Sequence, residues 1–522
     1  MTLRKKQARV LSAAAVCLFA AGWQVPPRRG SGAQPKGYSM ELKVTLSPGQ
    51  AEVIVGESIP VAIRIQNAGN VPVEVPHHLG PSPFEFVVRA AKDGRVVRRL
   101  SERRAAGARY GEPEREMAIP TEMLAPGAGF EYQDDLAGLM PSALGPGEYR
   151  ISASVAGAAG SIESGLSPLI VKAPRVRALA AVFDPVGRLE QVLAHEPGKQ
   201  QPEDEQQPAA LLQNTSREDA PQDGTWYRRI EQATDVRSVA VAAPLDAGQR
   251  LRWFAWLAKN AIGAAASEQR YLAKSIDPVP LGVEAASLQE TGWQIADNRA
   301  LFAAVGVEAG HVSLAAATFD RQTGASIRRV RLAAAAQPAI WAARYRAQPP
   351  ARFDVVWAEE REGRTRICRQ AVMPERGAAE QPVVLIERRE QVAAIAMESV
   401  AGATAGVVDV LLGPVGDDAR MVLLRLPLGG GAPLVRWEFR APSMLDKSRP
   451  SEWMLPRAPL ADPVVFARLR NGLMMRHASE GSEWSDLPDS AAAGILRLEA
   501  AQDRLWAIWT DPRQGLVYRM IP

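Results

Sequence analysis

The sequence predicts an all-β protein in which a β-sandwich precedes a six- or seven-bladed β-propeller. One phrase occurs twice: Phe353–Gly363 and Leu505–Gly515 each carry an apolar run that ends in Trp, with an acidic residue, Arg and Gly at the second, fourth and sixth positions after it. Eleven of the twelve tryptophans lie between Trp226 and Trp509, so two parts with different packing are the simplest explanation. Short alternating strands fill the part before Trp226.

The first 22 residues have the pattern of a cleaved signal peptide. A basic stretch, Arg4–Arg9, precedes the apolar run Val10–Gly22. Those 13 residues are fewer than the roughly 20 that span a bilayer as a helix. An uncleaved anchor is the alternative. Lipidation of Cys17 is not favoured, because Val16 stands where a small residue is required.

Cysteine usage and charge bound the compartment and the partners. Cys17 and Cys368 are the two cysteines, so the mature chain cannot form an internal disulfide, and we expect Cys368 to be a packing residue. The formal net charge of +4 equals the contribution of Arg4, Lys5, Lys6 and Arg9, which leaves a neutral body. We therefore expect export to a bacterial periplasm, cell surface or medium, no nucleic-acid partner, and no transmembrane segment beyond the signal peptide.

Residues 38–174, after a flexible linker at 23–37, predict the sandwich. The predicted strands are 41–46, 51–55, 59–65, 71–75, 84–88, 96–97, 146–155 and 167–171, with a hairpin turn at Asp93–Gly94. The phrases Val55–Val61, Asn67–Asn70 and Pro146–Tyr149 resemble bacterial immunoglobulin-like modules of secreted proteins. That resemblance implies an immunoglobulin-like sandwich and no catalytic residue. We expect 101–117 to be a charged loop.

Residues 175–522 predict the propeller. The composition of 197–223, rich in Gln, Glu, Pro and Asp, predicts a long polar loop. Further on, apolar runs end at intervals of 42 to 55 residues, which suits four-stranded blades. Ala178–His195 supplies another blade or the strand that closes the ring. An α-solenoid is the alternative, although Gly and Pro interrupt the candidate helices. The ends of the runs are Trp256, Gly306, Trp357, Leu412, Ala467 and Trp509.

The repeated phrase resembles the blade motifs of sialidase-like propellers. Ser479–Trp484 and Asp223–Trp226 also resemble degenerate Asp-boxes, the turn motifs of that family. The resemblance implies a fold and not an activity, because Asp-boxes stabilise turns on the outside of the ring. A sialidase-like enzyme would also need an arginine cluster, a Tyr–Glu nucleophile pair and an acid/base Asp. We expect Tyr227, Tyr271, Tyr345 and Tyr518 to be packing residues.

The remaining polar motifs predict structure rather than chemistry. The acid and Arg pairs Glu359/Arg361 and Asp511/Arg513 are expected to fix turns. Asp417–Asp418 suits a hairpin turn, and Gly429–Gly431 lacks the Lys-Ser/Thr of a phosphate loop. We expect no metal site and no cofactor, because the histidines are isolated or adjacent on a strand. They are His77, His78, His195, His311 and His477.

The sequence favours an exported, non-catalytic binding protein. Its propeller or its sandwich would engage a protein or a glycan in the envelope or outside the cell. The alternatives are a sialidase-like hydrolase or a lyase with its site in the central funnel, and a structural role in an assembly. Catalytic residues are not identified by the sequence, and converging arginines cannot be selected among so many.

Overall fold

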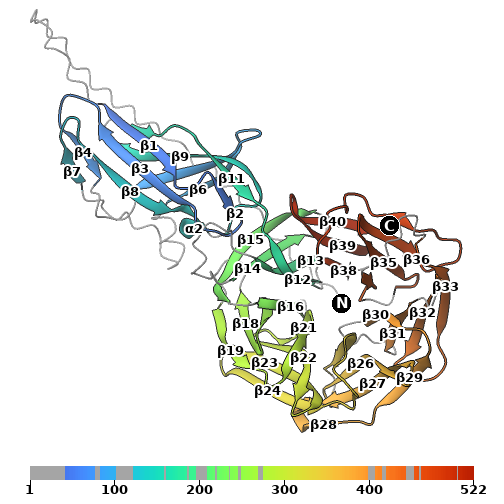
Figure 1. Ribbon diagram of the computed structural model, residues 1–522. Coiled ribbons are helices and arrows are strands. Elements are labelled where there is room, and N and C mark those ends of the chain that lie inside the picture. Colours follow the sequence, from blue (N-terminus) through green and yellow to red (C-terminus); the bar gives the residue numbers. More distant parts are fainter. Residues whose placement is uncertain are drawn as a thin grey trace, which may run out of the picture.

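The computed structural model describes residues 41–521, apart from segments 77–82, 102–120, 141, 158–159, 185–186, 196–208, 218–219, 234–235, 245–247, 268–273, 348, 398–405, 414–418, 443–451, 458–459 and 502–503. The described chain is built almost wholly of strands and forms a sandwich beside a ring (Figure 1). The predicted signal peptide, the linker at 23–37 and the loop at 101–117 lie almost wholly outside the described residues.

The sandwich consists of a three-stranded sheet, β1-β3-β8, facing a larger sheet in the order β2-β11-β9-β5-β6, with β10 paired to β9 and a separate β4–β7 ribbon. Each predicted strand is present, and β7, β8, β10 and the short helix α2 are additional. The elements are β1 (Leu42–Pro48), β2 (Glu52–Ile54), β3 (Pro60–Asn67), β4 (Val73–Pro76), β5 (Phe84–Ala90), β6 (Val96–Leu100), β7 (Thr121–Leu124), β8 (Gly129–Asp135), α2 (Leu136–Leu139), β9 (Gly147–Gly157), β10 (Gly160–Glu163) and β11 (Ser167–Lys172).

Alternation of apolar and polar residues explains these strands. In β3 the side chains of Val61, Ile63 and Ile65 are buried in the core, and the residues between them point away from it. Asn67 ends this strand and is fully buried, and its amide donates to the carbonyls of Val71 and Leu124 at 2.8 and 2.9 Å. The predicted turn at Asn67–Asn70 is therefore held by a satisfied buried amide.

The described strands of the ring form seven blades. A nine-stranded sheet holds two of them, joined by the parallel pair β16–β21. The first blade is β12 (Val176–Phe183), β13 (Arg188–His195), β14 (Ala209–Arg217) and β15 (Ala220–Ala233), the second is β16 (Val236–Pro244), β17 (Arg252–Ala258), β18 (Ala261–Ser267) and β19 (Lys274–Pro280), and the third is β20 (Glu284–Leu288), β21 (Thr291–Ala296), β22 (Arg299–Glu308), β23 (His311–Asp320) and β24 (Gly324–Arg331). The fourth blade is β25 (Trp341–Arg346), β26 (Arg352–Arg361), β27 (Arg364–Met373), β28 (Ala378–Ala379) and β29 (Val383–Arg388), with the 3-10 turn η1 (Pro374–Arg376), and the fifth is β30 (Val392–Met397), β31 (Val407–Leu412), β32 (Arg420–Pro427) and β33 (Val435–Arg440). The sixth blade is β34 (Glu452–Met454), β35 (Val464–Leu469), β36 (Gly472–His477) and β37 (Ser485–Asp486), and the seventh is β38 (Leu496–Ala501), β39 (Arg504–Asp511) and β40 (Gly515–Ile521).

The predicted all-β sandwich and propeller are confirmed, and the blade count is seven. The ends of the apolar runs, from Trp256 to Trp509, fall on β17, β22, β26, β31, β35 and β39. Each of these is the second main strand of its blade, where both faces are buried between neighbouring blades. Trp357 and Trp509 are fully buried there, which explains why the apolar runs recur at a blade's spacing.

The polar loop expected at 197–223 is wrong for its second half. Residues 209–217 form β14, and residues 220–233 form β15. The composition misled because the polar side chains of β14 face a buried carboxylate rather than water: Gln213 and Thr215 donate to Glu190 at 3.0 and 2.7 Å. Asp223–Trp226 lies inside β15 and does not form an Asp-box turn.

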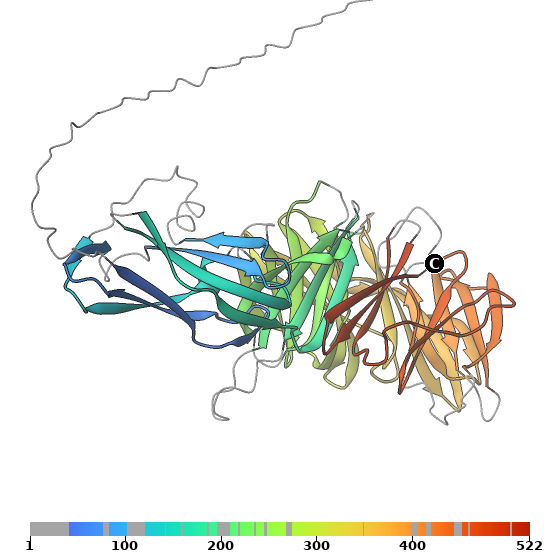
Figure 2. The ribbon, with the colours of Figure 1, turned by 90° about the horizontal axis from the view of Figure 1, so that it is seen from above.

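One continuous apolar core joins the sandwich to the first and last blades. It contains sandwich residues such as Val55 and Leu144, together with Leu212 and Trp226 of the first blade and Trp506 of the last. A backbone bridge pairs Ala143 with Trp226. The sandwich lies beside the ring rather than over its opening (Figure 2). Its position relative to the blades is therefore fixed by buried packing.

Among the strands that the structure describes, none is exchanged between the two ends of the ring. The first blade consists of β12–β15 and the last of β38–β40, so each blade is made from one continuous part of the chain. Side chains bridge the seam: the Tyr518 hydroxyl donates to Oε1 of Gln191 at 3.1 Å, and Nε of Arg497 donates to the Leu179 carbonyl at 2.8 Å. The sandwich packs against both the first and the last blade, and this shared core holds the two ends of the ring together.

Candidate functional site

The centre of the ring holds a hollow of about 520 Å³ at the face where the inner strands begin. Val176 of β12, Arg237 of β16, Glu452 of β34 and Leu496 of β38 each lie at or next to the first residue of their strand. We call this hollow the funnel. Its lining residues are Val176, Arg177, Ala178, Leu179, Arg237, Ser238, Val239, Leu288, Glu290, Glu452, Arg468, Gly494, Ile495, Leu496, Arg497 and Thr510.

Two arginines hold the carboxylate of Glu290 in the funnel. Arg497 pairs with Oε1 of Glu290 at 2.5 Å, and Arg457 pairs with Oε2 and also donates to the hydroxyl of Thr291. Arg457 follows β34 in the sixth blade, whereas Glu290 precedes β21 in the third, so this ion pair crosses the ring. Because each oxygen meets a different guanidinium, Glu290 is fixed between the two.

The environment acts differently on the two guanidinium groups. Burial lowers the pKa of Arg497, and the neighbouring Glu290 only partly offsets this. For Arg457, burial acts in the same direction, but Glu290 and Glu499 outweigh it and the pKa is raised. Both side chains remain charged. Arg497 also donates to the carbonyls of Leu179 and Leu496, at 2.8 and 2.7 Å, which fixes its direction.

Glu499 is a further titratable group of this cluster whose acidity is altered. Its side chain is 9% exposed, and Oε1 lies 3.6 Å from Nη1 of Arg457. Burial raises the pKa of Glu499 to about 7; Arg457 acts against this shift and Glu290 adds to it. Glu499 therefore exists in both protonation states near neutral pH, which is the property of a general acid or base.

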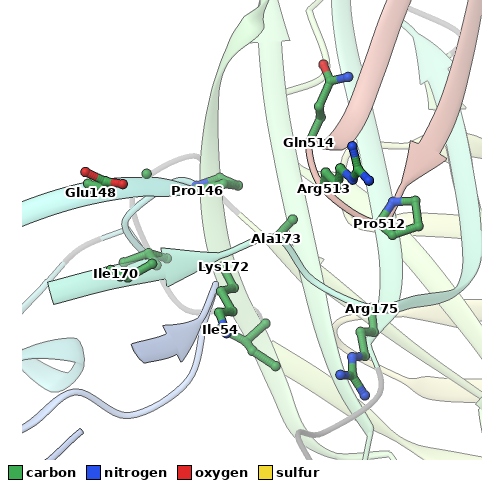
Figure 3. A pocket seen from close by; sticks show the side chains of 12 residues that line it. Ile54, Pro146, Glu148, Ile170, Lys172, Ala173, Arg175, Pro512, Arg513 and Gln514 are labelled. Carbon is green, nitrogen blue, oxygen red and sulfur yellow. The ribbon is translucent and has the colours of Figure 1, made fainter. Parts of the chain in front are cut away.

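A second hollow, of about 630 Å³, lies where the sandwich meets the last blade (Figure 3). We call it the junction crevice. Sandwich residues form one wall, and the turn between β39 and β40 forms the other. Its lining residues are Ile54, Pro146, Gly147, Glu148, Ile170, Val171, Lys172, Ala173, Arg175, Pro512, Arg513 and Gln514.

The tyrosines considered from sequence are not brought into the funnel where their side chains are described. Tyr345 packs against Phe353 and Trp293, with ring centroids 5.3 and 5.8 Å apart, between the third and fourth blades. Tyr518 lies in the seam, where burial raises its pKa. Both are packing residues, as expected. Tyr271 and the side chain of Tyr227 lie outside the described residues.

Of the two acid and Arg pairs of the repeated phrase, Asp511/Arg513 fixes a turn as expected, whereas Glu359 lies within β26 and bonds to groups outside the turn that follows it. Oδ1 of Asp511 accepts from the backbone N–H groups of Arg513 and Gln514, both at 2.8 Å. Oε2 of Glu359 accepts from the N–H of Ala335 at 3.2 Å and from the indole of Trp357 at 3.3 Å. Asp511 thus meets its expected partner Arg513 through the backbone of that residue, whereas Glu359 meets Ala335 and Trp357.

The other predicted residues take structural positions. Cys368 is buried, and burial together with Glu359 raises the pKa of its thiol to about 12. Gly429–Gly431 forms the turn between β32 and β33, and Ser479–Trp484 forms the turn between β36 and β37. His311 is exposed at the start of β23, and His477 lies 3.2 Å from Asp462. His77, His78, Asp417, Asp418 and the side chain of His195 lie outside the described residues.

Two further findings concern metals and membranes. Within the described segments, no three histidine, cysteine, aspartate or glutamate side chains are placed to hold a metal ion. The same part of the chain contains no helix that is long and apolar enough to cross a bilayer.

The sequence gives no sign of the cluster at the funnel, which comprises Glu290 and Arg497 of its lining and their neighbours Arg457 and Glu499. Arg457, Arg497, Glu290 and Glu499 come from three blades, and no local motif surrounds any of them. Arg and Glu are common throughout the chain, so nothing in their spacing marks these four. Their meeting is a consequence of ring closure, which a one-dimensional pattern does not encode.

Comparisons with known proteins find weak similarities to solved structures alone. No protein-family model matches the chain, and no curated protein matches it by sequence. Among solved structures, Sqt1 of Saccharomyces cerevisiae is 11% identical over 72% of this chain and 93% of its own, with a TM-score of 0.36. An acylaminoacyl peptidase of Pyrococcus horikoshii is 10% identical over 67% and 51%, with a TM-score of 0.37. The polysaccharide lyase Uly1 is 6% identical over 67% and 91%, with a TM-score of 0.40. The neighbours include enzymes and scaffolds, and this chain is similar to them at low identity.

Proposed function

We propose that the protein is an exported binding protein whose funnel receives a negatively charged ligand. One observation carries the proposal: among the lining residues that the structure describes, arginines outnumber acids, with Arg177, Arg237, Arg468 and Arg497 beside Glu290 and Glu452. Arg177 and Arg237 are exposed at its mouth. Arginine is the side chain best suited to bind carboxylate, sulfate or phosphate groups.

Other features expected from the sequence also support a binding role, and none of them identifies a chemical reaction. The N-terminal pattern supports export. An immunoglobulin-like character of the sandwich is supported by the sheet order β2-β11-β9-β5-β6 and by Tyr149, whose hydroxyl donates to the Gly145 carbonyl at 2.9 Å, the contact of a tyrosine corner. A sialidase-like character of the ring is supported by the turn at Ser479–Trp484, where the Ser479 backbone and hydroxyl both donate to Asp462.

A calorimetric titration of the full chain tests the binding role. The probes are an acidic peptide, an oligogalacturonate, a neutral gluco-oligosaccharide and an oligolysine. We expect heat of binding from an acidic probe, weakening with added salt, and none from oligolysine. The variant Arg177→Gln with Arg237→Gln should bind more weakly. Equal binding of neutral probes, or no binding by either acidic probe, would overturn the proposal.

A second candidate is a hydrolase or lyase acting in the funnel on an acidic glycan. Glu499 favours it, because a carboxyl group with a pKa of about 7 can act as a general acid and this one contacts Arg457, the partner of the funnel residue Glu290; Glu499 itself is buried and is not among the residues that line the funnel. Incubation of acidic oligosaccharides with the protein, followed by mass spectrometry, tests this. Turnover abolished in Glu499→Gln would establish the enzyme, whereas intact substrate at every pH from 5 to 8 would exclude it for those substrates.

A further inference from the structure

Glu499 is a buried acid that lies one strand repeat deeper than the lining of the funnel. Arg497, two residues before it on β38, belongs to that lining. In a strand, residues two apart project to the same side at a spacing of about 7 Å. The side chain of Glu499 is 9% exposed, so water and salt screen it little. Its carboxyl group is therefore placed to respond to a charge in the funnel.

The carboxyl group of Glu499 is poorly stabilised as a carboxylate. Among the described residues, none donates a hydrogen bond to its buried Oε1. Nη1 of Arg457 lies 3.6 Å from that oxygen and donates to the hydroxyl of Thr291, and Nη2 of the same side chain pairs with Glu290. A buried carboxylate without a donor is costly, whereas the protonated acid carries no charge and costs less. Burial is thus the main cause of the raised pKa of Glu499, about 7.

The protonation state of Glu499 sets the net charge of the cluster beside the funnel. This cluster holds two arginines, Arg457 and Arg497, and two acids, Glu290 and Glu499. With Glu499 protonated, two positive charges face one negative charge, and the net charge is +1. With Glu499 ionised, the net charge is zero. The cluster is therefore more favourable to an anion in the first state.

The other charged groups around the funnel leave this balance unchanged. Glu452 of β34 and Arg468 of β35 form an ion pair at 3.0 Å. Arg177 of β12 and Arg237 of β16 belong to the lining, and arginine side chains stay charged at the pH values used with proteins. Titration of Glu499 thus changes the charge beside the funnel by one unit near pH 7.

A negative charge in the funnel would favour the protonated form of Glu499. Glu290 already has this effect, because its charge adds to the upward shift of the pKa that burial causes. Two unit charges about 10 Å apart, at an effective dielectric constant of about 20, interact strongly enough to change an equilibrium constant roughly 10-fold. By linkage, an anion that acts on Glu499 in this way binds about 10-fold more tightly when Glu499 is protonated.

We propose that an anion entering the funnel binds together with one proton, which Glu499 takes up from water. The inference rests on the proposed binding function and specifies how that function is regulated. The proton adds to the carboxylate of Glu499, and no other covalent bond forms or breaks. Arg457 and Arg497 keep their pairing with Glu290, so the ligand does not require either arginine to be released. The affinity for the anion is higher at acidic pH and falls as the pH rises through 7.

Isothermal titration calorimetry of the full chain tests the inference without any substitution. The probes are a peptide of four aspartates with blocked ends and a tetragalacturonate, whose carboxyl groups are ionised above about pH 6. Titrations at pH 7.5 in two buffers of different ionisation enthalpy give the number of protons taken up. We expect about 0.5 proton per bound probe, and a dissociation constant about 5- to 10-fold larger at pH 8.5 than at pH 6.

Three variants identify the group that takes up the proton. Glu499→Gln resembles the protonated acid, so it should bind at both pH values as tightly as the wild type does at pH 6, without proton uptake. Glu452→Gln removes an acid from the lining and should change the affinity by a similar factor at both pH values. His477→Gln, on the sixth blade, should keep the pH dependence of the wild type.

The outcomes separate this inference from the proposed function. Wild-type binding that is equally tight at pH 6 and 8.5, without proton uptake, would show that the inference is wrong and leave the binding function standing. Proton uptake that persists in Glu499→Gln would assign the proton to another group and would also refute the inference. If neither probe binds at either pH, both the function and the inference fail.

Discussion

The altered acidity of Glu499 predicts a pH dependence of stability that one substitution removes. The pKa of this carboxyl is about 7 in the folded protein, against an ordinary value of 4.5. Below pH 4.5 it is protonated in both the folded and unfolded states and contributes no pH dependence. As the pH rises from 4.5 to 7, the folded state binds more protons than the unfolded state, so the free energy of unfolding falls.

The size of the effect follows from the shift. A difference of about 2.5 pKa units corresponds to about 3 kcal/mol, since each unit is worth about 1.4 kcal/mol. Glu499→Gln cannot ionise, so this loss of stability should be absent from it. The free energy of unfolding of the variant minus that of the wild type should therefore be about 3 kcal/mol larger at pH 8 than at pH 4.

Chemical denaturation monitored by tryptophan fluorescence measures this difference. Eleven of the twelve tryptophans lie at Trp226 or beyond, so the signal reports on the ring. The control is Glu362→Gln, whose side chain is 83% exposed and should change the pH profile little. A Glu499→Gln profile parallel to that of the wild type from pH 4 to 8 would refute the account of the cluster.

Three further predictions concern the rest of the molecule. Trp226→Ala should destabilise the protein by about 3–5 kcal/mol, because this buried side chain lies where the sandwich meets the ring. A fall in melting temperature smaller than that of a surface variant, measured by differential scanning calorimetry, would contradict this. Asp409→Ala should cost about 3 kcal/mol in a denaturant titration, because Arg425, whose side chain is 12% exposed, pairs with both carboxylate oxygens at 2.7 Å and would lose its counter-charge. Asp409→Leu with Arg425→Met should cost much less, since burial raises the pKa of Asp409 in spite of that pair. Cys368 should not react with a thiol reagent until the protein unfolds, and rapid labelling of the native chain would show that its burial is incomplete.

The blade period could be predicted from sequence because it reflects one physical requirement. The second strand of each blade is buried on both faces, which selects long apolar runs such as those ending at Trp357 and Trp509. Strands whose polar side chains face other blades do not show this pattern. In β14, Gln213 is buried and bonded to Glu190, so composition alone predicted a loop there.

The funnel could not be predicted, and the reason is again physical. Glu290 and Arg457 are 167 residues apart and meet because the ring brings the third and sixth blades across its centre. Arginine serves in this chain as an exposed charge, as a buried partner such as Arg252, and as a funnel residue. Since one residue type fills all three roles, its count carries no information about which arginines converge.

A crystal structure of the full chain with an acidic peptide tests the central claim most directly. The account predicts that peptide carboxylates lie in the funnel, against Arg177 and Arg237. A peptide bound elsewhere, such as along the edge strand β6, with the funnel unchanged, would contradict it.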